Sequence, residues 1–365
     1  MADAEISSLV DAAIDGNEQR SVAQAAFARA SAQEQEAGRV AVGEGEIEAQ
    51  AVPRTAAVLL GLQNIVSEVG EVERPRGDVA LAIEEQLRFA PVARARHQPT
   101  ADALATALAE IGEGDAAAQA AAIAELREAA RSAGLQLSSE SNEYLRSFLR
   151  GRKYRQDEAL ETLTNYETMN GLTNWRWLTA SHPVVQAELR EGLVRLLPTR
   201  CARGGESIII FDSRKLTKEK LTVGLGTTIM ARHYLLESLL TDSSIATGLV
   251  AIMDGRGLGL SLLPHVNREE MRLNAFMLER MMPLRLRGIY IVNAPWFFRL
   301  FWNIMSSFMS AKTRERMRIV SSTEELATIF GPANLPPDYG GTLDFDVEKE
   351  IDQAVQLEQA VRSQF

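Results

Sequence analysis

Cysteine and histidine are scarce in this chain of 365 residues, which has one cysteine, Cys201, and four histidines. A single cysteine cannot form an intramolecular disulfide, and this favours a reducing compartment, by default the cytoplasm. The histidines, at positions 97, 182, 233 and 265, form neither an H-x-x-x-H nor an H-E-x-x-H pair. The sequence therefore predicts neither a disulfide scaffold nor a helical metal site.

The chain also lacks the short motifs of common enzyme classes. Its glycine runs, Gly224-Leu-Gly226 and Gly255-Arg-Gly257-Leu-Gly259, do not complete G-x-G-x-x-G, and neither G-x-x-x-x-G-K-[ST] nor G-x-S-x-G occurs. A tight turn after a strand accounts for the second run without any phosphate. We expect no catalysis and no cofactor, and a dinucleotide-dependent enzyme is the least favoured function.

Long apolar runs are absent as well. The N-terminus, MADAEISSLVDAAIDG, has acids where a secretory signal would have bases, so we expect no export or transit signal. The most apolar run, 296–309, is interrupted by Arg299 and Asn303 and falls short of the roughly 20 residues that span a bilayer. We expect contact with a membrane to be peripheral.

Aromatic residues make up only 6% of the chain, but they are concentrated. Six of them fall within thirteen residues: Trp296, Phe297, Phe298, Phe301, Trp302 and Phe308. The net charge of −10 hides a similar concentration, because eight basic residues and one acid lie between Arg280 and Arg318. This window carries about +7, and such a patch predicts an anionic partner.

The N-terminal half reads as helical. Residues 1–110 are rich in Ala, Glu and Gln and predict a helical or partly disordered acidic extension that ends in a linker at 93–100. Apolar residues at helical spacing predict helices over 120–133, 143–154 and 157–169, which together form a small module over 115–180.

The C-terminal half alternates strands and helices. Three short apolar runs, SIIIF (207–211), GLVAIM (248–253) and GIYIV (288–292), are typical of strands buried on both faces. Helical stretches at 222–240 and 268–282 separate them. This order predicts an α/β domain over 184–345 with a mostly parallel sheet, followed by a helical tail over 346–365.

The run from Pro295 to Met309 predicts a helix of unusual polarity. Proline suits a first helical position. Arg299, Asn303, Ser306 and Ser310 recur at steps of four, three and four and form one narrow polar stripe on an otherwise apolar helix. Such a helix needs cover on two sides, either from the protein alone or from the protein and a second apolar phase.

Cations flank this apolar helix on both sides. Arg285 and Arg287 alternate along a strand and so share a face, and Lys312 and Arg316 are four apart on a helix and also share one. From the residues alone, either pair could equally be a solvated polar edge.

Three motifs together resemble the CRAL-TRIO lipid-binding family. Phe148-Leu-Arg150-Gly-Arg152-Lys153-Tyr154 is similar to the family's FLRARKF-type helix, and 283–295 is similar to its strand before the gate helix. Leu335-Pro336-Pro337-Asp338-Tyr339-Gly340-Gly341 resembles the closing LPxEYGG turn. The resemblance covers about 115–345 and is nearest to the α-tocopherol transfer protein and cellular retinaldehyde-binding branch. Gly151 and Asp338 depart from the usual Ala and Glu.

The resemblance implies a CRAL-TRIO fold in which a mobile gate helix covers an apolar cavity. Gate residues would be Trp296, Phe297, Leu300, Phe301, Ile304 and Phe308. The pocket would be lined by Thr227, Ala231, His233, Met253, Met277, Leu278, Ile289 and Ile291. For His233, a core position and a pocket position both stay open.

The resemblance also implies the ligands. The cargo would be one hydrophobic lipid of tocopherol, retinoid or phospholipid type, with no nucleic acid partner. A phosphoinositide-containing membrane would be held by Arg152, Arg285, Arg287, Lys312 and Arg316.

Two functions therefore stand. The leading one is non-catalytic lipid binding and transfer between membranes by a cytoplasmic protein that associates peripherally with endomembranes. The alternative is a lipid-sensing interaction module that acts on a protein partner through its N-terminal region.

Overall fold

The computed structural model describes residues 98–240 and 242–363, together with 62, 65–67, 69 and 72; the side chains of 242, 243, 304, 305 and 361 are excepted. Most of the acidic extension predicted for 1–110, including the helical patches at 56–69 and 77–87, lies outside the described residues. Among those described, no helix is both long enough and apolar enough to cross a membrane.

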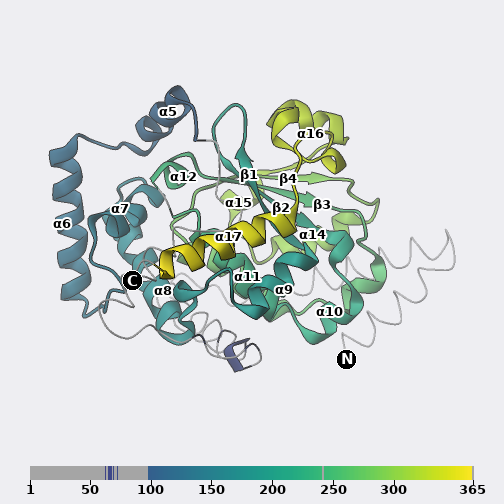
Figure 1. The fold of residues 1–365 in the computed structure, drawn as a ribbon, viewed down its shortest axis with the longest axis horizontal. Helices are drawn as coiled ribbons and strands as arrows, with labels where there is room; N and C mark the ends of the chain where they lie inside the picture. Colours follow the sequence, from purple (N-terminus) through teal and green to yellow (C-terminus); the bar gives the residue numbers. More distant parts are fainter. Residues whose placement is uncertain are drawn as a thin grey trace, which may run out of the picture.

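A helical module forms the first part of the described chain and lies on the left in Figure 1. It contains α5 (Ala101–Ile111), α6 (Ala116–Ser132), α7 (Asn142–Gly151) and α8 (Gln156–Thr173). Thr100, Asp115 and Ser141 cap the first three helices by accepting hydrogen bonds from first-turn amides. The helices predicted at 120–133, 143–154 and 157–169 are confirmed as α6, α7 and α8, with shifted ends.

The module packs through the apolar faces that its periodicity predicts. Ile123, Leu126 and Ala130 of α6 are buried in one cluster with Phe148 of α7 and Tyr166 of α8. Helix α5 packs elsewhere: its Ala107 and Ile111 form a small cluster with Ala246 of α12 (Asp242–Thr247). Residues 101–110, which we predicted to belong to the N-terminal extension, therefore pack on α12.

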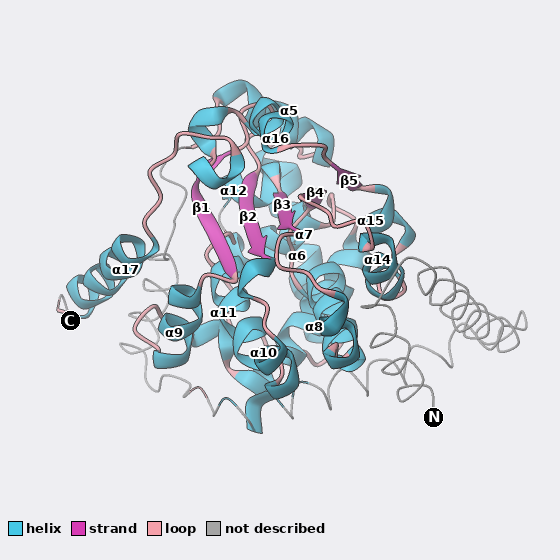
Figure 2. Ribbon diagram, turned by 90° about the vertical axis from the view of Figure 1, so that its right-hand side faces the viewer, coloured by secondary structure: helices cyan, strands magenta, loops and turns pink. Residues whose placement is uncertain are grey.

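A sheet of five strands lies at the centre of the described residues (Figure 2), in the order β1-β2-β3-β4-β5. Its strands are β1 (Val194–Arg200), β2 (Ser207–Asp212), β3 (Leu249–Asp254), β4 (Leu286–Val292) and β5 (Met317–Ile319). Strands β2 to β5 are parallel, and β1 pairs antiparallel with β2. The predicted α/β class, the mostly parallel sheet and the three predicted strands are confirmed.

Strand β1 was not predicted. Its sequence, VRLLPTR, contains a proline and two arginines, so it does not read as a buried strand. The structure accommodates Pro198 because β1 is an edge strand whose pairing with β2 is irregular between Leu196 and Arg200. Strand β5, with only three residues, was also missed.

Alternation along the strands sends side chains to two different clusters. Ile208 and Ile210 of β2 and Val250 and Ile252 of β3 lie on one face. That face is covered by α16 (Thr323–Phe330) and by the turns η5 (Pro332–Asn334) and η6 (Pro337–Tyr339). The opposite face is covered by the helices of the crossovers and belongs to the large cluster that also contains the helical module.

The remaining helices connect or flank the strands. They are η1 (Trp175–Trp177), α9 (Pro183–Glu191), η2 (Ser213–Lys215), α10 (Lys218–Val223), α11 (Gly226–Glu237), η3 (Leu260–His265), α13 (Arg268–Phe276), the π-helical turn η4 (Met277–Met281), α14 (Phe298–Ser306), α15 (Ala311–Glu315) and α17 (Val347–Arg362).

Two predicted helices are shorter than expected. The stretch 222–240 is not one helix, because Gly224 adopts a φ of 114° that is open to glycine but not to other residues, and this separates α10 from α11. Helix α14 begins at Phe298, so Pro295 is not its first residue. The carbonyl of Pro295 instead accepts a hydrogen bond from the Phe298 amide at 2.8 Å.

The helical module contacts the sheet where α7 ends. A Cβ atom added at Gly151 would lie 2.7 Å from the carbonyl carbon and 2.9 Å from the Cα of Pro283, just before β4. This contact leaves no room for a side chain at position 151. The next residue, Arg152, donates hydrogen bonds to the carbonyls of Glu279 (3.0 Å) and Met282 (3.1 Å) and to the hydroxyl of Thr162 (2.7 Å).

We predict that Gly151→Ala lowers the free energy of unfolding by about 1–3 kcal/mol, because the added methyl group must displace the Pro283 backbone. Urea denaturation followed by circular dichroism measures this change. Gly171→Ala is the matched control: it lies in α8, and an added Cβ there has no neighbour within 4 Å. This control should be neutral or slightly stabilising, and equal effects of the two variants would contradict the contact.

Candidate functional site

The predicted gate segment is the crossover between β4 and β5. Helix α14 buries Phe298 and Phe301 in the large cluster, while Phe297, Leu300, Trp302 and Phe308 are half-buried. Arg299 and Asn303 of the predicted polar stripe are exposed. The side chain of Ile304 lies outside the described residues.

The outer surface of this crossover combines apolar and basic groups. Trp296, just before α14, and Ile319, in β5, are each 60% exposed. Between them in the sequence, Arg299, Lys312 and Arg314 are exposed. Arg318, the residue before Ile319, is exposed as well. A surface of this composition suits the interface of an anionic bilayer.

The far end of α14 is fixed to its neighbours. The Ser310 amide donates to the Glu279 carboxylate of η4 at 3.0 and 3.3 Å. Arg314 donates to the carbonyls of Met309 (2.7 Å) and Ser306 (3.3 Å), which satisfies the last turn of the helix. At the start of the crossover, the rings of Trp296 and Phe297 meet edge to face at 5.4 Å, and Phe297 packs against the large cluster.

Beneath the helices, the central strand is incompletely covered. Ala251 and Met253 of β3 and Phe211 of β2 are half-buried, whereas Ile210 and Ile252, on the opposite face, are fully buried. The three half-buried side chains belong to the face that the crossover helices cover. The helices therefore do not pack tightly against the carboxyl half of β2 and β3.

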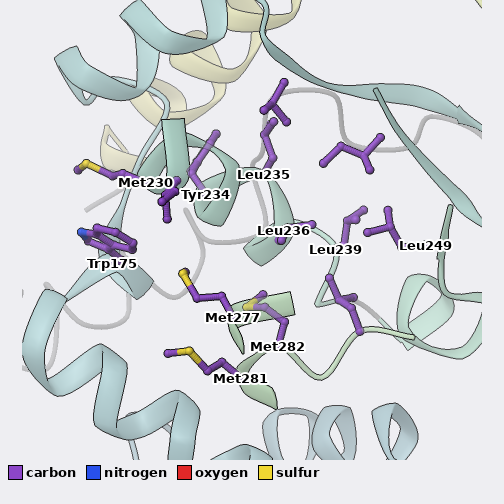
Figure 3. Close-up of a cluster of buried hydrophobic side chains, with 14 of the residues drawn as sticks. Trp175, Met230, Tyr234, Leu235, Leu236, Leu239, Leu249, Met277, Met281 and Met282 are labelled. Carbon is purple, nitrogen blue, oxygen red and sulfur yellow. The ribbon is translucent and has the colours of Figure 1, made fainter. Parts of the chain in front are cut away.

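The predicted pocket residues lie on this same side of the sheet. Ile289 and Ile291 of β4 are buried, Met277 of η4 is buried and Leu278 is half-buried. Figure 3 shows Met277, Met281 and Met282 below the buried side chains of α11. The structure thus brings the predicted residues of β3, β4 and η4 to one apolar cluster.

The predicted residues of α11 differ in their surroundings. Thr227 donates its hydroxyl to the Glu188 carboxylate at 2.6 Å, and Ala231 is buried. His233 has no exposed surface; its ring lies 5.7 Å from that of Trp175, and its Nε2 is 3.5 Å from Glu237 Oε1. A core position for His233 agrees with this burial.

The predicted cations gather at the amino ends of β4 and β5. Arg285, which precedes β4, and Arg287, within it, both bind the carboxylate of Glu110 from α5, with contacts of 3.0 Å and 2.6 Å. Arg285 also donates to the Ala246 carbonyl at 2.7 Å and is 8% exposed. Arg285 and Arg287 are therefore not a free solvated edge, because Glu110 of the same chain bridges them.

Glu110 is strongly ionised in this position. Hydrogen bonds from Arg287, partly offset by burial, and then those from Arg285 lower the pKa of Glu110 to about 2. A carboxyl with a depressed pKa stabilises the fold above its ordinary pKa and loses that contribution only as the pH falls towards 2. Protonation therefore cannot free the two arginines near neutral pH.

Lys312 and Arg316 complete the basic cluster. Arg316 donates to the Leu286 carbonyl, and exposed Lys312 has no hydrogen bond or ion pair within the described residues. Burial and the charges of Arg316 and Arg155 lower the pKa of Lys312. Arg152 is different, because its guanidinium donates to protein carbonyls and to Thr162 and ties α7 to η4.

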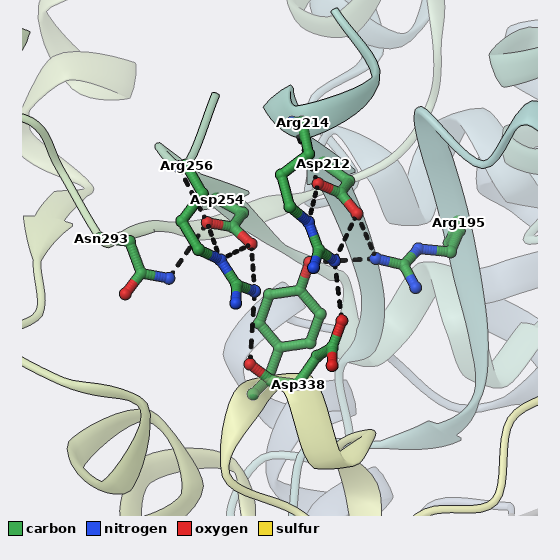
Figure 4. A network of polar contacts seen from close by, with 8 residues as sticks. Arg195, Asp212, Arg214, Asp254, Arg256, Asn293 and Asp338 are labelled. Carbon is green, nitrogen blue, oxygen red and sulfur yellow. Dashed lines mark hydrogen bonds and ion pairs between the residues drawn. The ribbon is translucent and has the colours of Figure 1, made fainter. Parts of the chain in front are cut away.

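A second polar network was not predicted. At the carboxyl ends of the strands, Asp212 pairs with Arg195 (2.9 Å) and Arg214 (2.8 Å), and Asp254 pairs with Arg256 (2.6 Å). Figure 4 shows that Asn293 and Asp338 join the same network. Burial opposes ionisation of Asp254, but hydrogen bonds from Arg256 outweigh it and lower the pKa. The repeated D-x-R after β2 and β3 was the sequence signal.

This network holds the LPPDYGG turn. Arg214 donates to Asp338 at 2.8 Å, and Arg195 donates to the Tyr339 hydroxyl at 3.0 Å and lies over its ring. Except for Arg195 Nε, which is buried without an acceptor, the charged groups of the network pair with one another and hold the turn that closes the sheet face opposite the crossover helices.

The comparisons with known proteins concern the same part of the chain. Residues 201–341 match the CRAL/TRIO domain, which confirms the resemblance to the CRAL-TRIO family over this segment. The chain is similar to Clavesin-1 of Xenopus laevis, at 26% identity over 204 residues, 55% of this chain and 60% of that protein. It is also similar to Alpha-tocopherol transfer protein-like of Homo sapiens, at 26% identity over 201 residues, 54% of this chain and 58% of that protein.

The chain thus spans about 60% of the length of the curated relatives that it matches. Among solved structures it is similar to the crystal structure of Sfh5, at 13% identity and a TM-score of 0.48, over 69% of this chain and 100% of that one.

Proposed function

Because residues 201–341 match the CRAL/TRIO domain, we propose that this protein binds one hydrophobic lipid and transfers it between membranes without catalysis. The observation that carries the proposal is the incomplete cover of Phe211, Ala251 and Met253 beneath the crossover helices. In the middle of a sheet, apolar side chains are normally packed to the density of an organic crystal. A lipid chain lying between β3 and the helices would complete that packing.

The β4–β5 crossover is the proposed gate and membrane contact. Its end at Ser310, held by Glu279, and the exposure of Trp296 at its start suit a segment that swings about its far end. Moving an apolar side chain from water into the bilayer interface contributes at most about 1.5–3 kcal/mol. Contact with a membrane would therefore favour the open gate.

The basic cluster is the proposed phosphoinositide contact. Each Lys or Arg near an anionic leaflet contributes about 1 kcal/mol. A phosphate that binds Arg285 and Arg287 would have to replace Glu110, whose carboxylate offers the same bidentate geometry. In this proposal, the membrane phosphate takes the place of the Glu110 carboxylate at Arg285 and Arg287. Peripheral association with endomembranes from the cytoplasmic side follows from it.

The alternative, a lipid-sensing module that acts through the N-terminal region, stays a prediction, because most of that region lies outside the described residues.

For the basic cluster, we predict that Arg287→Ala/Lys312→Ala weakens binding to vesicles with a few per cent of phosphoinositide by about tenfold to thirtyfold. Arg285 is left intact because it also supports Ala246. The control, Lys215→Ala/Lys218→Ala, removes the same charge from exposed residues after the carboxyl end of β2, at the opposite edge of the sheet. Equal co-sedimentation of the two double variants at physiological salt would reject the cluster.

For the internal competitor, we expect Glu110→Gln to strengthen binding to the same vesicles by about threefold to tenfold, since one carboxylate charge near the cluster contributes on the order of 1 kcal/mol. Asp102→Asn, on the same helix and with the same change of charge, is the control and should leave affinity nearly unchanged. A gain of the same size in both variants would show a general charge effect and not exchange at Arg285 and Arg287.

For the gate, we predict that Trp296→Ser/Phe297→Ser slows lipid transfer between vesicles by roughly tenfold, because these side chains no longer gain from leaving water. Buried Phe301 is left unchanged so that the core stays intact. Val223→Ser, which alters an 81% exposed valine of α10, is the control. Unchanged transfer by the double variant would remove this segment from the mechanism.

A further inference from the structure

Arg200 is buried, and Arg232 is half-buried with its Nε and Nη2 atoms buried; the two arginines differ in their partners. Arg200, at the end of β1, donates to the Gly205 carbonyl (3.0 Å) and to the hydroxyls of Ser244 (2.8 Å) and Thr247 (3.3 Å). Arg232, on α11, donates through Nη1 to the Asn274 Oδ1 of α13, but its Nε and Nη2 are buried without an acceptor. Within the described residues, no carboxylate lies within ion-pair distance of Arg232.

An isolated buried guanidinium is costly, so proteins normally pair it with an anion. Burial lowers the pKa of both Arg200 and Arg232 to about 10, which leaves each of them charged at neutral pH. For Arg200, neutral acceptors surround the charge. Within the described residues, the side-chain amide of Asn274 is the only acceptor that Arg232 has, and no anion compensates its charge.

The unused atoms of Arg232 are those that hold carboxylates elsewhere in this chain. Arg150 binds Glu113 through Nε and Nη2, at 2.5 and 2.6 Å, and Arg214 binds Asp212 through the same two atoms, at 2.9 and 2.8 Å. This edge of the guanidinium presents two parallel N–H groups that match two oxygens of a carboxylate or phosphate. Arg232 thus keeps a complete oxyanion-binding edge vacant.

Arg232 and Asn274 lie on elements that also carry predicted pocket residues, α11 with Ala231 and the α13–η4 stretch with Met277 and Leu278. One turn away on α11 lie Ile229 and Leu236, and Leu278 of η4 comes one turn after Asn274 of α13. Ile229 and Leu236 belong to the apolar cluster that contains Met277, Met281 and Met282, and Leu278 packs against it. Figure 3 shows Leu236 above Met277 and Met282. A headgroup at Arg232 would have its hydrocarbon chain beside these side chains.

We propose that Arg232, assisted by Asn274, binds the oxyanion headgroup of the carried lipid, so that the cargo is an acidic lipid with a carboxylate or a phosphate. The inference rests on the proposed lipid-binding function and narrows it. A neutral tocopherol or retinoid would leave the guanidinium unpaired, whereas an acidic lipid supplies the missing charge. Of the cargo classes that the sequence left open, only a phospholipid has such a headgroup. A fatty acid, which the sequence did not suggest, has one as well.

The test offers the full-length protein three probes in separate neutral phosphatidylcholine vesicles: oleate, dioleoyl phosphatidic acid and α-tocopherol. Lipid retained after re-isolation of the protein is measured by mass spectrometry. We expect the wild type to retain at least one acidic lipid in preference to α-tocopherol. Whether it retains oleate or phosphatidic acid distinguishes a carboxylate headgroup from a phosphate.

Arg232→Met should reduce retention of the acidic lipid at least tenfold and leave any α-tocopherol retention unchanged. Its ligand-free melting temperature should equal or exceed that of the wild type, because an uncompensated buried charge has been removed. Arg200→Met is the control: it breaks a satisfied network, so it should melt at a lower temperature.

Equal retention of the acidic lipid by Arg232→Met and the wild type would overturn the inference. A wild type that prefers α-tocopherol would overturn it too but leave the proposed lipid binding intact, and this result needs no variant to fold. Retention of none of the three lipids would instead count against the proposed function itself.

Discussion

The alternation of side chains along β2, β3 and β4 determines how the rest of this structure is arranged. One set of positions, with Ile210 and Ile252, is sealed against α16 and the LPPDYGG turn, and the arginine–aspartate network at the strand ends holds that turn in place. The other set, with Ala251 and Met253, is left partly uncovered below the crossover helices. Because the first face is rigidly closed, any rearrangement that admits a ligand has to occur on the second.

Acidic and basic groups also lie at opposite ends of the parallel strands. The acidic network residues lie at the carboxyl ends of the parallel strands, and the basic cluster lies at the amino ends of β4 and β5. Helix α5 brings Glu110 to that cluster, and the loop after α5 brings Glu113 to Arg150, so this segment neutralises cations of both the module and the sheet. An acidic chain can therefore present a basic surface whose strength depends on where one helix lies.

The sequence predicted the parts whose signals are local. Apolar runs located β2, β3 and β4, and the helical spacing of Ile123, Leu126 and Ala130 located α6, because burial of these faces dominates their folding. Strand β1 was missed because Pro198 and its arginines are tolerated only at an edge with irregular pairing. Gly224 was read as part of a helix because its positive φ is a property of the folded chain.

The sequence predicted where the residues of the candidate site lie better than it predicted which of them are paired. The family motifs brought Arg285, Arg287, Lys312 and Arg316 to one region, but no pattern could pair Arg285 with Glu110, which lies 175 positions away in the chain. Arg232 was passed over as an ordinary helix residue, since only the folded structure tells a satisfied arginine from an unsatisfied one.

The contact between Gly151 and Pro283 also limits how this protein can be recombined with its relatives. The end of α7 and the residues before β4 fit each other through backbone atoms, and Arg152 adds hydrogen bonds across the same junction. A chimera whose helical module carries alanine at position 151 would bring a methyl group into the Pro283 backbone. Because the contact is made by backbone atoms, such grafts would need to exchange both sides of the junction together.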